Sequence, residues 1–132
     1  MEYLYYLENA SLILQLIEYL NDRPQLKVSY VTVINTIDGW AIRVRLKHQP
    51  SPQEDSNFRS ILSELGILYS PPKQLQLALW SLAGGKSPVE VMRRYQVAVV
   101  FHGQPKIEEI EALRQQFIKG LADCPQTLLE LR

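Results

Sequence analysis

Two four-residue segments of this 132-residue chain carry the same signal for the start of a helix. Both segments, Ser51-Pro52-Gln53-Glu54 and Ser87-Pro88-Val89-Glu90, have an N-cap serine, a proline at the first helical position and a glutamate three residues after the serine. The serine oxygen can accept the backbone N–H of the third helical residue, and the glutamate can accept the N–H of the cap. Proline fits because the N–H at that position has no intrahelical partner. We therefore predict helices that begin at Pro52 and Pro88.

A β-hairpin pattern precedes both helix starts, over Leu26 to Lys47. Thr36-Ile37-Asp38-Gly39 resembles a type I turn followed by a left-handed glycine, which predicts a three-residue loop with a bulge. Trp40 then faces Thr36. One side of the hairpin carries Leu26, Val28, Tyr30, Ile34, Trp40, Ile42, Val44 and Leu46, and the other carries Lys27, Ser29, Val31, Val33, Ala41, Arg43, Arg45 and Lys47. We expect Trp40, Ile42, Val44 and Leu46 to be buried, and Arg43 and Arg45 to point away from the main core. A two-residue Asp-Gly loop would instead exchange the faces of the first strand.

Periodicity predicts the other elements around this hairpin. Residues 2–20 are expected to form one helix, and 67–70 a short strand. Residues 73–83 fit either a strand or a helix, and the scarcity of β-branched residues favours a helix. The apolar run at 96–102 is typical of a central strand that is covered on both faces. An amphipathic helix should follow, and its inward residues are Ile107, Ile110, Leu113, Phe117 and Leu121. A last helical turn is expected over 125–132.

These elements predict a single α+β domain over residues 1–132. Its small, mostly antiparallel sheet consists of the hairpin 26–47 and the strand 96–102, and helices cover it. The chain is 46% hydrophobic, which is ordinary for a globular protein. A single cysteine, Cys124, fits a reducing cytoplasm. Polar residues interrupt the apolar N-terminal segment, so neither a membrane span nor a secretory signal is expected.

Residues that could carry chemistry are few. Gly84-Gly85-Lys86-Ser87 lacks the first glycine of a phosphate-binding loop, because Trp80 occupies that position. His48, His102 and Cys124 lack the short spacing of a structural zinc site. We therefore expect a protein that is not an enzyme and that binds neither a metal nor another cofactor.

Two surfaces are candidates for binding a partner protein. Arg43, Arg45 and Lys47 form a basic stripe beside Val31 and Val33, a mixture that suits protein contacts, although a solvated sheet face would look the same. The tyrosines at positions 3, 5 and 6 crowd the predicted first helix and could serve a subunit contact, such as a homodimer, or the core. The predicted partner-binding residues are Tyr3, Tyr5, Tyr6, Val31, Val33, Arg43, Arg45 and Lys47.

These surfaces predict an adaptor or assembly factor that binds another protein, possibly a peptide tail. The alternative is a regulatory protein that binds nucleic acid through the basic hairpin face with Arg93 and Arg94. The net charge of zero argues against that alternative. The size of the chain, its Leu- and Gln-rich helices and the pairs Pro24-Gln25, Pro52-Gln53 and Pro125-Gln126 resemble accessory proteins of photosynthetic bacteria, among them the carboxysome shell assembly chaperones. This resemblance implies a shell protein as partner and no cofactor.

Overall fold

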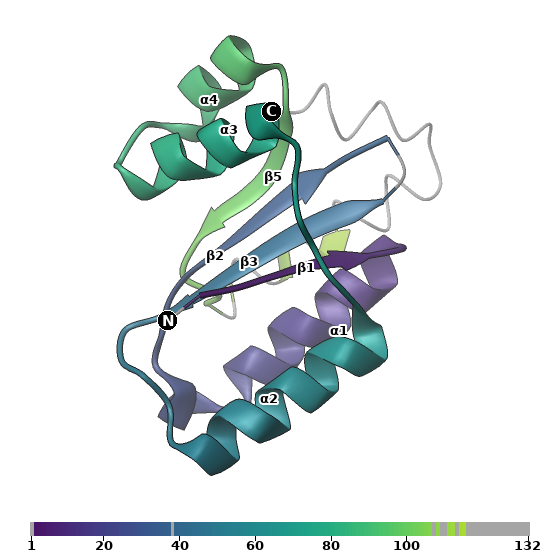
Figure 1. Cartoon of the computed structure of the whole chain (residues 1–132), viewed down its shortest axis with the longest axis vertical. Helices are drawn as coiled ribbons and strands as arrows, with labels where there is room; N and C mark the ends of the chain where they lie inside the picture. The colour runs from purple at the N-terminus through teal and green to yellow at the C-terminus, as the bar shows by residue number, and fades with distance from the viewer. Residues whose placement is uncertain (1, 38, 107, 109–110, 113, 116–132) are drawn as a thin grey trace.

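A computed structural model describes residues 2–37 and 39–106, together with 108, 111, 112, 114 and 115. In this part of the chain an antiparallel sheet of five strands lies between two pairs of helices (Figure 1). The predicted α+β class, with a small antiparallel sheet covered by helices, is confirmed. The strands have the spatial order β4-β1-β3-β2-β5 and are β1 (Glu2–Leu7), β2 (Val28–Asn35), β3 (Trp40–Leu46), β4 (Gly66–Leu68) and β5 (Ala98–Gly103).

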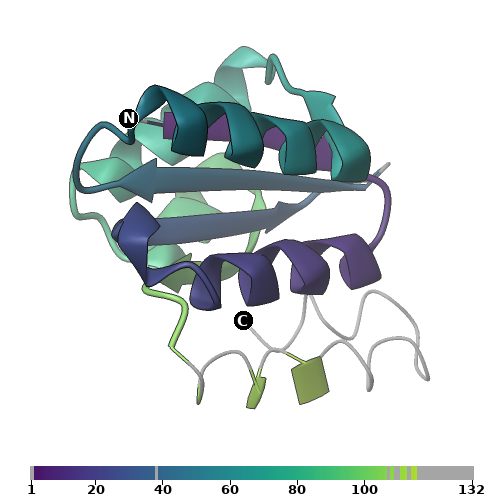
Figure 2. The same ribbon diagram turned by 90° about the horizontal axis from the view of Figure 1, so that it is seen from below.

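Four helices cover the two faces of this sheet. They are α1 (Ala10–Asn21), α2 (Pro52–Leu65), α3 (Lys73–Ala83) and α4 (Pro88–Tyr95), and a short 3-10 helix (Pro24–Leu26) precedes β2. The helices α1 and α2 lie side by side on one face (Figure 2), and α3 and α4 lie on the other. The core is therefore divided into two apolar layers that the sheet separates.

The layer under α1 and α2 is the larger of the two. It includes Tyr3, Tyr5, Leu7, Ile13, Leu16, Ile17, Val31, Val33, Ile42, Val44, Phe58 and Leu62. The layer under α3 and α4 consists of Ile34, Ala41, Leu75, Ala78, Leu79, Leu82, Val91 and Val99. Because each strand presents alternate residues to the two layers, both faces of the sheet are apolar over much of their area.

Both predicted helix starts are confirmed. The Glu54 N–H donates to Ser51 Oγ at 3.2 Å, and the Ser51 N–H donates to Glu54 Oε1 at 3.3 Å, which completes a capping box. The Glu90 N–H likewise donates to Ser87 Oγ at 3.2 Å. The segment 73–83 is the helix that its composition favoured.

The N-terminal prediction was wrong, because residues 2–20 do not form one helix. Tyr3, Tyr5 and Leu7 alternate toward the larger layer as parts of β1, and aromatic residues favour such strands. Asn9 is the N-cap of α1, since its side chain accepts the Leu12 N–H at 3.0 Å. The helical period therefore starts only at Ala10.

The hairpin register also differs from the preferred prediction. Trp40 pairs with Asn35, not Thr36, and Val33 pairs with Ile42. The Thr36 N–H donates to the Gly39 carbonyl at 2.8 Å, and the Gly39 N–H donates to Thr36 Oγ1 at 3.1 Å. These bonds pair Thr36 with Gly39, so two residues connect the strands where three were predicted. The residues of β2 therefore face the opposite sides of the sheet from those predicted. The predicted burial of Trp40, Ile42, Val44 and Leu46 is confirmed.

The segment 96–102 was predicted to form a central strand, and this was wrong. The strand β5 lies at the end of the strand order, beside β2. Its apolar run nevertheless contacts both layers: Val99 packs under α3 and α4, while Val100 and Phe101 pack against the other layer. A continuous apolar run therefore indicates that both faces of a strand are covered, and it does not indicate that the strand is central in the sheet. The predicted helix with Ile107 to Leu121 inward, the turn over 125–132 and Cys124 lie outside the described residues.

Candidate functional site

The predicted partner-binding residues are divided between the two faces of the sheet. Val31 and Val33 are fully buried against α1 and α2, so their predicted exposure beside the basic residues was wrong. The cause is the hairpin register, which pairs Val33 with Ile42 and Val31 with Val44. Tyr3 and Tyr5 are buried in the same layer, on a strand and not on a helix. These four side chains form the core and offer no surface to a partner.

Tyr3 fastens β1 to α2. Its ring meets the ring of Phe58 edge to face at 4.7 Å, and its hydroxyl donates to Asp55 Oδ1 at 2.7 Å. Arg59 Nε also donates to this carboxylate, at 3.0 Å. Burial, followed by the bond to Asp55, raises the pKa of Tyr3. The hydrogen bond from Tyr3, with help from Arg59, lowers the pKa of Asp55.

This hydrogen bond predicts a stability loss in acid that Tyr3→Phe should reduce. Because the pKa of Asp55 is lower in the folded protein, its contribution is complete above the unfolded carboxyl pKa of about 3.9 and disappears as the pH falls through the folded value. Urea unfolding at pH 7 and near pH 3 measures that loss for both proteins. An equal loss in the parent and in Tyr3→Phe would contradict the assignment.

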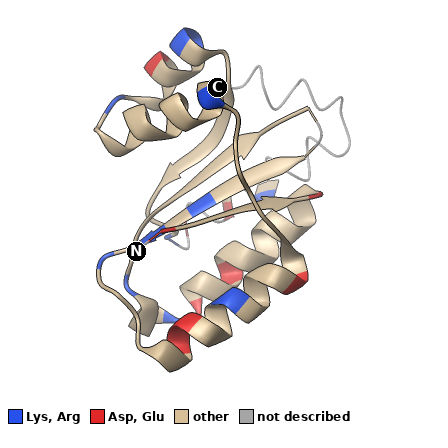
Figure 3. Cartoon of the chain, viewed as in Figure 1, with Lys and Arg blue, Asp and Glu red and all other residues tan. Residues whose placement is uncertain are grey.

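The predicted basic stripe is not continuous. Arg43 and Arg45 do point away from α1 and α2, as predicted, but Arg43 is only 5% exposed. Arg45 is exposed and pairs with Glu2 at 3.3 Å, and Lys47 is exposed beyond the end of β3. Basic positions are scattered over the described elements (Figure 3). This face therefore offers little to a long polyanion such as nucleic acid.

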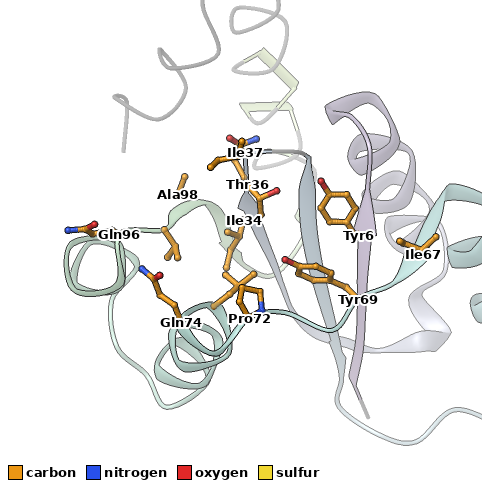
Figure 4. Close-up of a pocket in the computed structure, with 13 residues that line it drawn as sticks. Tyr6, Ile34, Thr36, Ile37, Ile67, Tyr69, Pro72, Gln74, Gln96 and Ala98 are labelled. Atoms are coloured by element: carbon orange, nitrogen blue, oxygen red, sulfur yellow. The ribbon is translucent and has the colours of Figure 1, made fainter.

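A cavity of about 730 Å³ lies at the hairpin end of the sheet, on the face of α3 and α4 (Figure 4). Its described lining is mostly apolar and contains no Asp, Glu, Lys, Arg, His or Cys. It comes from Tyr6, Ile34, Asn35, Thr36, Ile37, Ile67, Tyr69, Pro72, Gln74, Leu75, Gln96, Val97 and Ala98. The cavity is thus an uncharged recess that offers apolar contacts and amide or hydroxyl hydrogen bonds.

Backbone contacts between distant segments build this cavity. Tyr6 pairs with Ile67 across β1 and β4, and the Tyr69 N–H extends that pairing by donating to the Leu4 carbonyl at 3.1 Å. The rings of Tyr6 and Tyr69 then lie 5.3 Å apart at one wall (Figure 4). Gln96 ends α4 in the left-handed conformation, with φ 55°, and turns the chain into β5 along the opposite wall.

Two isoleucines of the cavity lining, Ile37 and Ile67, are also exposed to solvent at its rim. Ile37, in the hairpin turn, is 103% exposed relative to the reference residue, and Ile67, in β4, is 67% exposed. Leu68 beside it is 71% exposed. Exposed apolar side chains that adjoin a recess are typical of binding surfaces.

Of the predicted site residues, only Tyr6 lines this cavity. Sequence reasoning missed Ile67, Tyr69 and Gln96, which are far apart in the chain. The available signal was the apolar Ile67-Leu68-Tyr69 segment, which precedes Pro71-Pro72 and has no amphipathic pattern of its own.

Two properties of the described residues bear on the possible chemistry. Within them, no group of three or more His, Cys, Asp and Glu residues could hold a metal ion. None of the helices in this part of the chain is long and apolar enough to cross a membrane. No family model, no curated protein and no solved structure matches this chain.

Proposed function

We propose that this protein is a non-enzymatic adaptor that binds an uncharged, apolar segment of another protein in the cavity between β1, β2 and α3. The supporting observation is the recess of about 730 Å³ with Ile37 and Ile67 exposed at its rim. Burying one such side chain contributes about 1.5–3 kcal/mol. The two isoleucines and the tyrosine wall are therefore able to supply the central apolar contacts of an interface.

The rim favours a polypeptide over a small molecule as the occupant. A compact ligand that filled the recess alone would cover only the parts of Ile37 and Ile67 that line it, and the rest of these exposed side chains would stay in water. A chain segment that crosses the recess can cover both. The lack of charge in the described lining selects apolar or neutral side chains, because a buried charge without a partner is costly.

Polar groups at the cavity suit the backbone of an extended segment. Asn35 and Gln96 contribute amides on either side, and Tyr6 contributes a hydroxyl. The strand β4 ends the strand order next to this wall, so its outer edge is placed to pair with an added strand. Strand addition beside side-chain pockets is a common mode of peptide recognition.

The resemblance to carboxysome shell assembly chaperones gives the first partner to test. We propose the tail of a shell protein as this partner, in the cytoplasm and without a cofactor. A second copy of the chain is the other protein partner that the experiment distinguishes, because a homodimer through the same rim would change the molecular mass in solution.

The double variant Ile37→Ser with Ile67→Ser tests the proposal. Both side chains are exposed, so the fold should be nearly unaffected. We expect the affinity for the shell-protein tail peptide, or for a purified partner found by pull-down, to fall about tenfold or more in a calorimetric titration. Trp80→Ser is the matched control, because Trp80 is 74% exposed on α3 and does not line the cavity.

Unchanged affinity of the folded double variant, or a loss in the Trp80→Ser control alone, would contradict binding at the cavity. Binding that falls steeply with salt and depends on Arg45 would instead favour the regulatory protein that binds nucleic acid. Sedimentation of the parent and the double variant identifies a homodimer, since only a dimer through this rim would dissociate in the variant.

A further inference from the structure

Arg43 is a buried cation, and two of its three nitrogens have no hydrogen-bonding partner in the part of the chain that the structure describes. It lies on β3, in the middle of the sheet, and its side chain is on the face of α3 and α4 beside Thr32 and Leu4. Its Nε and Nη2 groups are shielded from solvent and have no hydrogen-bond acceptor in the structure. Removing a charge from water without pairing it is costly, so buried charges in proteins are usually paired.

Aromatic and polar groups surround this guanidinium. The Cζ atom of Arg43 lies 5.2 Å from the centroid of the Tyr30 ring, and that of Arg45 lies 5.9 Å from the same ring. The His102 ring is 5.1 Å from Tyr30, and its Nδ1 forms a 2.7 Å hydrogen bond with the hydroxyl of Thr32. Tyr30 thus lies among two arginines and a histidine.

The charges in this cluster do not balance. Glu2 contributes the carboxylate, and it contacts Arg45 at 3.3 Å, on the exposed side. Burial and the nearby Arg43 lower the pKa of His102, so the imidazole is neutral at pH 7. Among the described residues, one carboxylate therefore faces two guanidinium groups, and no ion pair is formed by Arg43.

We propose that Arg43 is the centre of a binding site for one small oxyanion, a phosphate or a carboxylate. The unpaired Nε–H and Nη2–H are adjacent donors on one edge of the guanidinium, the pair that meets two oxygens of one oxyanion side by side. Arg45 supplies the second cation. This site is separate from the cavity, whose lining does not include Arg43, and it does not rest on the proposed function.

Two charged side chains near Arg43 are loosely held at the surface. Arg45 and Glu2 are each nearly half exposed, and their contacts with each other and with the Tyr30 hydroxyl are long, at 3.3–3.5 Å. Contacts of this kind at the surface contribute little stability. An oxyanion can therefore displace the Glu2 carboxylate from Arg45 and pair with both arginines.

Thermal unfolding in sodium phosphate, sodium acetate and sodium chloride of equal ionic strength tests the site. We expect phosphate or acetate to raise the Tm of the parent saturably, by about 5 °C or more at a hundredfold excess over Kd. Arg43→Met should abolish this rise and should be at least as stable as the parent in chloride. Arg59→Met is the matched control and should retain the rise, because Arg59 pairs with Asp55 on the exposed face of α2.

The salts distinguish the sources of the oxyanion. A rise with phosphate alone indicates a free phosphate ligand, and a rise with acetate indicates a carboxylate, such as an acidic side chain. Equal Tm values of the parent in all three salts, or an equal rise in Arg43→Met, would overturn the proposal. If Arg43→Met does not fold, NMR of the parent decides, because phosphate or acetate must shift the Arg43 Nε–H resonance.

Discussion

Phe58→Ala should lower the free energy of unfolding by about 3–5 kcal/mol, the usual cost of truncating a buried aromatic side chain. Phe58 is fully buried on α2. Its ring meets Tyr3 of β1 edge to face at 4.7 Å and stacks on Tyr19 of α1 at 6.0 Å. One side chain therefore joins two helices and the sheet, so its loss would leave a cavity that none of the three can fill.

Urea unfolding followed by circular dichroism measures this loss. Phe58→Leu should cost clearly less, because it retains much of the volume. Val89→Ala, on the exposed side of α4, should remain within about 0.5 kcal/mol of the parent. A loss below about 1 kcal/mol in Phe58→Ala would mean that the larger layer does not depend on this ring.

Gly66→Val should destabilise the protein by about 3 kcal/mol or release β4 from the sheet. A Cβ atom on Gly66 would lie 2.3 Å from the Tyr6 carbonyl oxygen, which belongs to the backbone of β1. The φ angle of Gly66 is −165°, an extended value open to any residue, so the cost is steric and not conformational. The clashing atom is part of the backbone of β1, so no side chain can rotate away to relieve the contact.

Amide hydrogen exchange in β4 and urea unfolding together measure this effect. Fast exchange at Ile67 and Leu68 with little global loss would show local release of the strand, which would also remove one wall of the cavity. Gly103→Ala is the control, since no atom lies within 4 Å of the corresponding Cβ position. Equal stability of the two variants would contradict the close approach of β1 and β4.

Local signals in the sequence predicted much of the fold. The caps at Ser51 and Ser87 depend on side chains within one turn, so their pattern was sufficient. The first strand was missed because Tyr and Leu residues fit both a strand and a helix, and only the partner strand β3 decides between them. The hairpin register depends on the number of residues in the loop. A difference of one residue decides which face of the sheet Val31 and Val33 occupy.

The cavity was not predictable from local signals. Its walls combine Tyr6, Tyr69 and Gln96, which meet only because β4 pairs with β1 and β5 pairs with β2. The burial of Arg43 was hidden for a similar reason. Alternation placed it on the face opposite the larger layer, but the sequence did not show that this face is covered as well.

The division of the core by the sheet has a consequence for how this protein can change over time. The cavity and the buried Arg43 both lie on the face of α3 and α4, whereas the larger apolar layer lies on the other. Substitutions at well-separated positions usually have additive effects on stability. Substitutions around the cavity and Arg43 can therefore accumulate on one face of the sheet, while the layer beneath α1 and α2 supplies the reserve of stability that tolerates them.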